Sequence, residues 1–216
     1  MDKIWRITIR LVLGLTGFSI LGFYKTYFGL FPNFDDTHWA VHAHVISVLG
    51  WLILLLRQAW LAKQGSFSQH RKFGRLSYLF VPVIILGFML VMYQGQLKHK
   101  TPELIGAVLF DGGLFLWFYI LAMLYRKNPP YHASYMMLSV VPFINPGLGR
   151  FISPEVSISV EFLLIVCLLL VASFQKKPYK PYLVAIVSFV LLLGSIVYVS
   201  VVNPSIFERI WVIIWG

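Results

Sequence analysis

Two carboxylic acids, Asp111 and Glu161, stand inside long apolar stretches of the sequence. An ionisable side chain is costly within a bilayer, so one that lies in an apolar segment is a functional candidate by default. A carboxylate in such a position can act as a general base or as a ligand of a metal ion. We therefore predict that any catalytic chemistry depends on Asp111 and Glu161.

Three histidines at the start of the second apolar stretch could complete a metal site. His38 and His42 are four residues apart and share one face of a helix, whereas His44 points about 160° away from His42. Two imidazoles and a carboxylate suit Zn or Fe, with a position left open for water or substrate. No compact motif such as H-E-x-x-H occurs. The pattern thus predicts metal ligands among these histidines without selecting the metal.

These polar residues are expected at one depth of the membrane. With a rise of about 1.5 Å per residue, four spans carry polar side chains roughly 6 to 10 Å below the outer surface: His42, His44, Asp111, Asn145 and Glu161. Three interpretations stay open. The layer stabilises the bundle by hydrogen bonds, binds a metal ion, or forms a path for protons or substrate. Arg150 is either a counter-ion for the carboxylates or an interfacial anchor.

A second cluster is expected at the opposite surface. A basic run, residues 69–75, precedes the third apolar stretch, and His132 opens the fifth. Two histidines on different helices at similar depth can ligate a b-type haem axially, so His70 and His132 are candidate cofactor ligands. The expected loop position of His70 weighs against haem. It favours a topology signal or a contact with anionic lipid.

Composition limits the class of protein. The 216 residues are 59% hydrophobic and only 12% charged, about half the charged fraction of an ordinary soluble domain. This excludes a soluble globular domain and a disordered chain. One cysteine, Cys167, allows no internal disulfide. The net charge of +10 is explained by loop residues that set membrane topology, so we expect no nucleic-acid partner.

The apolar stretches predict the elements that must position these side chains. A spanning helix needs about 20 apolar residues, and the candidate stretches are 8–28, 38–62, 76–95, 104–125, 132–150, 156–174 and 182–202. In the fifth, Pro142, Pro146 and Gly149 should kink or break the helix. The tail 205–216 is too short to span and is typical of an interfacial helix. We predict one domain, an all-α bundle of seven transmembrane helices.

Lysines and arginines predict the orientation of this bundle, because cytoplasmic loops collect them. With the N-terminus inside, the cytoplasmic side holds twelve: Lys3, Arg6, Arg10, Lys63, Arg71, Lys72, Arg75, Arg126, Lys127, Lys176, Lys177 and Lys180. The outer side then holds five: Lys25, Lys98, Lys100, Arg150 and Arg209. Arg57 lies within the second span and is not counted. The prediction is a cytoplasmic N-terminus and an outer C-terminus.

One stretch resembles a known family. His44, Gln58 and the run from His70 to Tyr78 (HRKFGRLSY) are similar to bacterial membrane proteins catalogued as domain of unknown function 2306. Ser77 is an insertion before the tyrosine of that pattern, and the match covers about 40 of the 216 residues. The resemblance implies a multi-pass protein of the bacterial inner membrane. It singles out Gln58, which we assign to the same outer polar layer as Asn145 and Arg150, and it implies little about activity.

Three functions follow from these observations. The first is a small membrane enzyme or binding protein that uses His42 or His44, Asp111 and Glu161 on a lipophilic substrate. The second is a haem protein that transfers electrons to or from quinone. The third is a non-catalytic subunit of a membrane complex. A retinal pump is not expected, because the seventh span, 182–202, contains no lysine for a Schiff base.

Overall fold

The structure, a computed structural model, describes residues 2–99, 103–203 and 205–215, with side chains for 9–94, 105–203 and 205–214. Over these residues all regular structure is helical. The long helices are α1 (Asp2–Gly22), α2 (Trp39–Lys63), α4 (Ser77–His99), α5 (Glu103–Leu124), α8 (Pro154–Phe174) and α9 (Lys180–Val202). The short ones are η1 (Phe28–Leu30), α3 (Phe67–Gly74), α6 (Pro129–Leu138), η2 (Val141–Phe143), α7 (Ile144–Leu148) and α10 (Ser205–Trp215).

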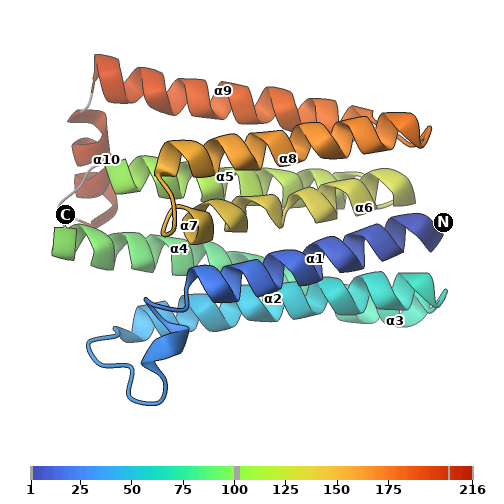
Figure 1. The fold of residues 1–216 in the computed structure, drawn as a ribbon, viewed down its shortest axis with the longest axis horizontal. Helices are drawn as coiled ribbons and strands as arrows, with labels where there is room; N and C mark the ends of the chain where they lie inside the picture. The colour runs from blue at the N-terminus through green and yellow to red at the C-terminus, as the bar shows by residue number, and fades with distance from the viewer. Residues whose placement is uncertain (1, 100–102, 204, 216) are drawn as a thin grey trace.

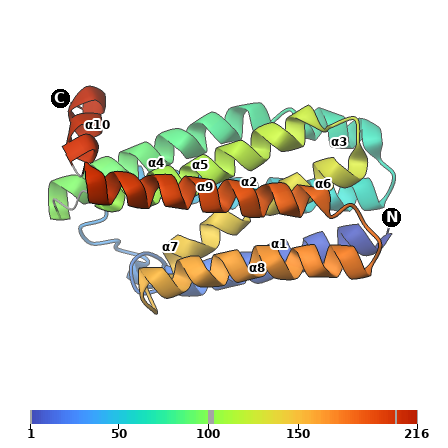
Figure 2. The ribbon, with the colours of Figure 1, turned by 90° about the horizontal axis from the view of Figure 1, so that it is seen from above.

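The long helices run side by side along the longest axis of the molecule (Figure 1). α2 packs against α1 and α4, and α5 packs against α4, α6 and α9. α8 packs against α9 and α7. α10 lies across the end of the bundle, at a steep angle to α9 in both views (Figures 1 and 2). The tail is helical as expected, and its interfacial position stays a prediction.

Five helical segments are long and apolar enough to cross a membrane: Trp39–Lys63, Phe67–Gln94, Ile105–Leu124, Pro154–Phe174 and Lys180–Val202. This is the pattern of a multi-pass membrane protein. The expected first span corresponds to α1, of which only the shorter apolar part Ile9–Gly22 has described side chains. The expected fifth span is broken into short pieces. The count of seven spans therefore stays a prediction.

The predicted fifth span, residues 132–150, is broken near its prolines, as the sequence predicts. α6 ends at Leu138, and η2 with Pro142 leads into α7 with Pro146. Proline lacks the backbone N–H that an α-helix needs, so the chain changes direction instead of continuing as one rod. α7 then packs directly on α1, where a Cβ on Gly22 would lie 2.8 Å from the Gly147 Cα. This close approach fixes the position of α7 and of Asn145 within it.

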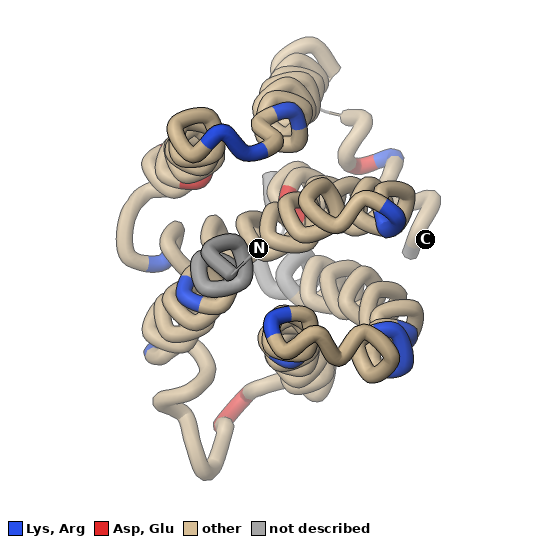
Figure 3. The backbone as a smooth tube through the Cα atoms, turned by 90° about the vertical axis from the view of Figure 1, so that its right-hand side faces the viewer, with Lys and Arg blue, Asp and Glu red and all other residues tan. Residues whose placement is uncertain are grey.

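Lysines and arginines gather at the end of the bundle where α3 lies. Figure 3 views this end and shows them around α3 and in the links from α5 to α6 and from α8 to α9. Of the residues counted for orientation, Lys3, Arg6, Lys98 and Lys100 lie outside the described side chains. The rest of the bundle between the two ends is apolar, with a core that extends through α2, α5 and α8.

Candidate functional site

A buried polar cluster joins three helices near α7. Asp111 in α5 is 4% exposed, and Asn145 in α7 donates hydrogen bonds from Nδ2 to both of its carboxylate oxygens at 3.2 and 3.3 Å. The Ser157 hydroxyl of α8 donates to the Asn145 Oδ1. Glu161, also in α8 and 0% exposed, is near enough to Asp111 for their charges to interact. We call these four residues the acid cluster.

The acid cluster is closed on itself. Neither carboxylate oxygen of Glu161 has a hydrogen-bond partner among the described residues, and both are buried. Arg150, a predicted counter-ion, instead donates to the Pro146 carbonyl and lies 4.1 Å above the centre of the Phe23 ring. A buried carboxylate without a cation or donor is costly. The cluster therefore links helices through Asn145, while Glu161 lies beside these bonds with both oxygens unpartnered among the described residues.

The predicted metal site of His38, His42 and His44 is not assembled. His38 caps α2, because its Nδ1 accepts a hydrogen bond at 3.2 Å from a backbone N–H of the first turn. His42 Nδ1 lies 2.8 Å from the Tyr27 hydroxyl, and the His44 ring packs on Phe88. In the part of the chain that the structure describes, no three side chains of His, Cys, Asp or Glu gather closely enough to hold a metal ion. Capping and packing occupy these histidines instead.

A cavity of about 450 Å³ opens at the other end of the bundle, beside α3. We call it the basic cavity. Its polar lining comes from α2, α3, α4, α6 and the links next to them: Gln58, His70, Arg71, Arg75, Ser77, Tyr78, Arg126 and His132. The cavity is of ordinary ligand-pocket size, which spans about 300 to 1,000 Å³. The second cluster predicted from the sequence thus surrounds a real space.

The apolar lining of the basic cavity lies deeper than the polar lining. Trp51, Leu54 and Leu55 of α2 line the cavity and are buried, with exposures of 0%, 6% and 6%. The three arginines of the lining are exposed. Among the described residues that line the cavity, none is acidic. The cavity is therefore amphipathic, with an apolar floor and a cationic rim.

His70 and His132 lie next to each other on the wall of the basic cavity. Their ring centres are 6.3 Å apart, and the ring planes meet at 78°. His132 Nδ1 is bonded to the Ala122 carbonyl at 2.8 Å. His70 Nδ1 lies 3.1 Å from the Gln58 backbone oxygen. Each ring is thus held through Nδ1 by an element other than its own.

Gln58 braces the helix that carries His70. With the side-chain amide turned so that all its partners are satisfied, its nitrogen donates to His70 Nδ1 at 2.8 Å and to the His70 carbonyl at 2.9 Å, and its oxygen accepts from the Gly74 N–H at 3.0 Å. α3 therefore folds back against the end of α2. The sequence reasoning expected His70 in a loop and Gln58 in the outer polar layer, and the structure puts both residues at the basic cavity.

Some lining residues were missed by the sequence reasoning. Arg126 was counted only as a topology signal, and Met123 and Met136 had no role. The one available signal was that Arg126 follows one apolar stretch and His132 precedes the next, which brings them to the same end of the bundle. The convergence with α3 depends on helix packing and has no local pattern.

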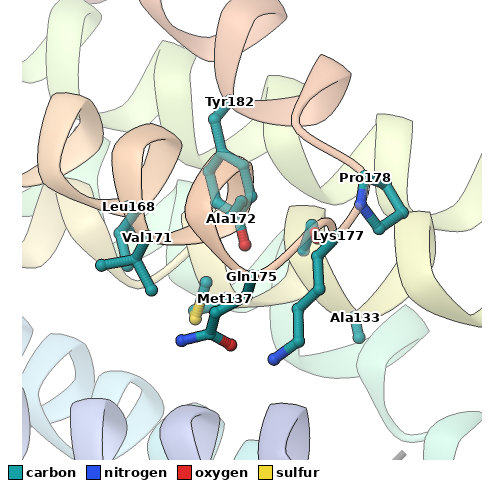
Figure 4. A pocket seen from close by; sticks show the side chains of 10 residues that line it. Ala133, Met137, Leu168, Val171, Ala172, Gln175, Lys177, Pro178 and Tyr182 are labelled. Atoms are coloured by element: carbon teal, nitrogen blue, oxygen red, sulfur yellow. The ribbon is translucent and has the colours of Figure 1, made fainter.

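A smaller pocket of about 40 Å³ lies between α6, α8 and the start of α9. Figure 4 shows its lining, in which Tyr182, Leu168 and Met137 are apolar neighbours of the Gln175 and Lys177 side chains. A volume of this size holds a few water molecules at about 10 to 15 Å³ each. Ala133 of α6 lines both pockets. The basic cavity is thus the larger of the two spaces by far.

Comparison of the chain with family models, curated proteins and solved structures finds no match. The resemblance to domain of unknown function 2306 stays a prediction.

Proposed function

We propose that the chain is a seven-span protein of the bacterial inner membrane that binds an amphipathic anion in the basic cavity, at the cytoplasmic surface. The long apolar helices and the collection of lysines and arginines at the α3 end support this orientation. The proposal keeps the lipophilic ligand expected from the sequence. It moves the binding site from the outer polar layer to the opposite end.

The polarity of the basic cavity is the observation that carries the proposal. A hydrocarbon or ring system fits the buried floor around Trp51 and Leu55, because burial of apolar surface there is favourable. A carboxylate or phosphate fits the rim, where Arg71, Arg75 and Arg126 supply planar, permanently charged donors. A neutral ligand would leave three cations uncompensated.

The acid cluster has a structural role in this proposal. Asn145 joins Asp111 of α5 to Ser157 of α8 by hydrogen bonds, and the Asp111 and Ser157 side chains are both buried. Interhelical hydrogen bonds of this kind stabilise bundles in lipid. Asp111 therefore acts as a helix contact, Glu161 forms no hydrogen bond among the described residues, and binding depends on the other end of the molecule.

Lipid co-purification tests the proposal. The full chain is purified from membranes, and bound anionic lipids and other amphipathic acids are identified by native mass spectrometry. We expect the double variant Arg75→Gln/Arg126→Gln to lose them. The matched control, Lys63→Gln/Lys72→Gln, removes the same charge from the same end but from residues outside the cavity lining. Equal loss in both variants would mean that a diffuse surface charge, and not the cavity, attracts the anion.

A further inference from the structure

We propose that the ligand of the basic cavity is a b-type haem, with His70 and His132 as its two axial ligands. The inference rests on the proposed function, since haem is itself an amphipathic anion: an apolar macrocycle that carries two propionates. It adds the identity of the ligand and the atoms that hold it.

The anchoring of both rings is the first argument. A histidine that binds a metal ion almost always uses its second ring nitrogen for a hydrogen bond to a carbonyl, carboxylate or water, which fixes the ring. The Ala122 carbonyl does this for His132. For His70, the Gln58 backbone oxygen lies 3.1 Å from Nδ1 and would accept the Nδ1 proton when Nε2 binds iron, in place of the bond that the Gln58 amide donates to Nδ1. In both rings Nδ1 is the anchored atom. No hydrogen bond to either Nε2 is formed within the described residues, so Nε2 is the nitrogen left for a ligand.

The separation of the rings is the second argument. An imidazole nitrogen lies about 1 Å from the ring centre and binds a first-row metal ion at about 2 Å, so two rings on opposite sides of one ion have centres about 6 Å apart. The observed separation of 6.3 Å matches this value. The rings come from α3 and α6, which lie far apart in the sequence. Their approach is a product of the fold.

The number of ligands favours haem over a bare metal ion. Zinc in a structural site takes four protein ligands, and in a catalytic site three. The described part of the chain offers only two histidines here and no third His, Cys, Asp or Glu close to them. Haem supplies four equatorial nitrogens of its own and needs only two axial ligands from the protein.

The basic cavity also suits the rest of the haem molecule. Its volume of about 450 Å³ and its apolar wall of Trp51, Leu54 and Met136 can receive a macrocycle. Arg75 and Arg126 can bind propionates, since arginine pairs with carboxylates through two parallel hydrogen bonds. The expected loop position of His70 counted against haem, but His70 lies within α3, which Gln58 ties to α2.

Absorption spectroscopy of the full chain, expressed with a haem precursor and purified in detergent, tests the inference. We expect one haem per chain, with the spectrum and electron paramagnetic resonance signal of six-coordinate low-spin iron. His70→Ala and His132→Ala should each lose haem or turn it high-spin, and added imidazole should restore the low-spin signal in chains that elute as folded protein. His99→Ala, at the far end of α4, is the control and should keep the wild-type spectrum.

Two results would overturn the inference. One is a colourless protein that also fails to take up added hemin. The other is low-spin haem that persists in the double variant His70→Ala/His132→Ala, which would place the ligands elsewhere. If the colourless protein still carries anionic lipid that the arginine variant loses, the proposed function stands and only the haem is wrong. If neither ligand binds, both proposals fail.

Discussion

The acid cluster and the basic cavity are both polar regions in an apolar helical bundle, and they differ in how their polar groups are satisfied. In the acid cluster, Asn145 bonds to Asp111 and Ser157, so these polar groups satisfy one another. In the basic cavity, the Nδ1 atoms of His132 and His70 are held by Ala122 and Gln58, and both histidines line a space of about 450 Å³.

This difference separates a helix contact from a binding site. Polar groups inside a membrane protein are costly wherever they lie, so their presence shows only that something compensates them. In the acid cluster, the compensation of Asp111 and Asn145 is internal. In the basic cavity three arginines and two histidines share one opening without an acidic residue in the described lining. The three arginine charges are the basis of the proposed anionic ligand.

The largest expected effect concerns the acid cluster. Asn145→Leu removes the bonds to Asp111 and Ser157. It leaves the Asp111 carboxylate buried without a hydrogen-bond partner among the described residues, while Ser157 keeps its bond to the Pro154 carbonyl. We expect a loss of about 3 kcal/mol in the free energy of unfolding, measured by denaturation in detergent, with ligand binding to the basic cavity unchanged. Asn203→Leu, an exposed control at the end of α9, should change stability by less than about 0.5 kcal/mol. If Asn145→Leu is as stable as the wild type, the acid cluster does not stabilise the bundle.

The next effect tests how α7 is positioned. A Cβ on Gly22 would lie 2.8 Å from Gly147, so Gly22→Ala should force α1 and α7 apart. We expect overpacking to lower the free energy of unfolding by about 2 kcal/mol. Thermal unfolding in detergent measures this loss. Gly17→Ala lies in the same helix with no atom within 4 Å of the added Cβ, and it should leave the unfolding temperature unchanged or slightly raised. Similar behaviour of the two variants would contradict the close contact.

A smaller effect tests the rim of the basic cavity. Arg126→Gln should weaken binding of an anionic amphiphile about tenfold, because it removes one charge-assisted hydrogen bond, while the unfolding temperature stays constant. Lys127→Gln removes the neighbouring charge, which does not line the cavity, and should leave the affinity unchanged. The affinities are measured by titrating the anionic amphiphile into each variant in neutral-lipid nanodiscs. If Lys127→Gln weakens binding as strongly, the rim has no specific role.

The smallest effect has the opposite sign. Glu161→Leu replaces two buried oxygens that have no hydrogen-bond partner among the described residues with an apolar side chain of similar size. We expect a gain of about 1 kcal/mol in unfolding free energy, because the cost of burying the polar group disappears. Glu155→Leu changes an exposed acid of the same helix and is the control. A loss of stability in Glu161→Leu would show that Glu161 has a required partner.

Local sequence signals predict much of this fold. The apolar stretches predict the long helices to within a few residues at most ends, and Ser153 followed by Pro154 indicates the start of α8, where the Ser153 side chain accepts from the Val156 N–H. The break in the fifth segment follows from Pro142 and Pro146. The first helix is the exception, since it starts at Asp2 and ends at Gly22 instead of spanning 8–28.

The candidate sites are predicted less well, because a site depends on which helix faces which. Depth along each span correctly suggested that Asp111, Asn145 and Glu161 lie together, since depth follows from residue count. Depth also placed His42 and His44 in this layer, and spacing added His38 as a metal ligand beside the carboxylates, but the described residues assemble no such metal site. His38 is used as a cap, and His42 contacts Tyr27 from the segment between α1 and α2.

The sequence by itself determined that this chain is helical and apolar, where most helices begin and end, and which end of the bundle collects positive charge. These properties depend on composition and on neighbours a few positions away. The tertiary structure alone decided that α3 folds back under Gln58 and that His70 comes within 6.3 Å of His132. The reason is physical: a cavity is formed by side chains from helices far apart in the sequence, and only their packing determines whether space remains between them.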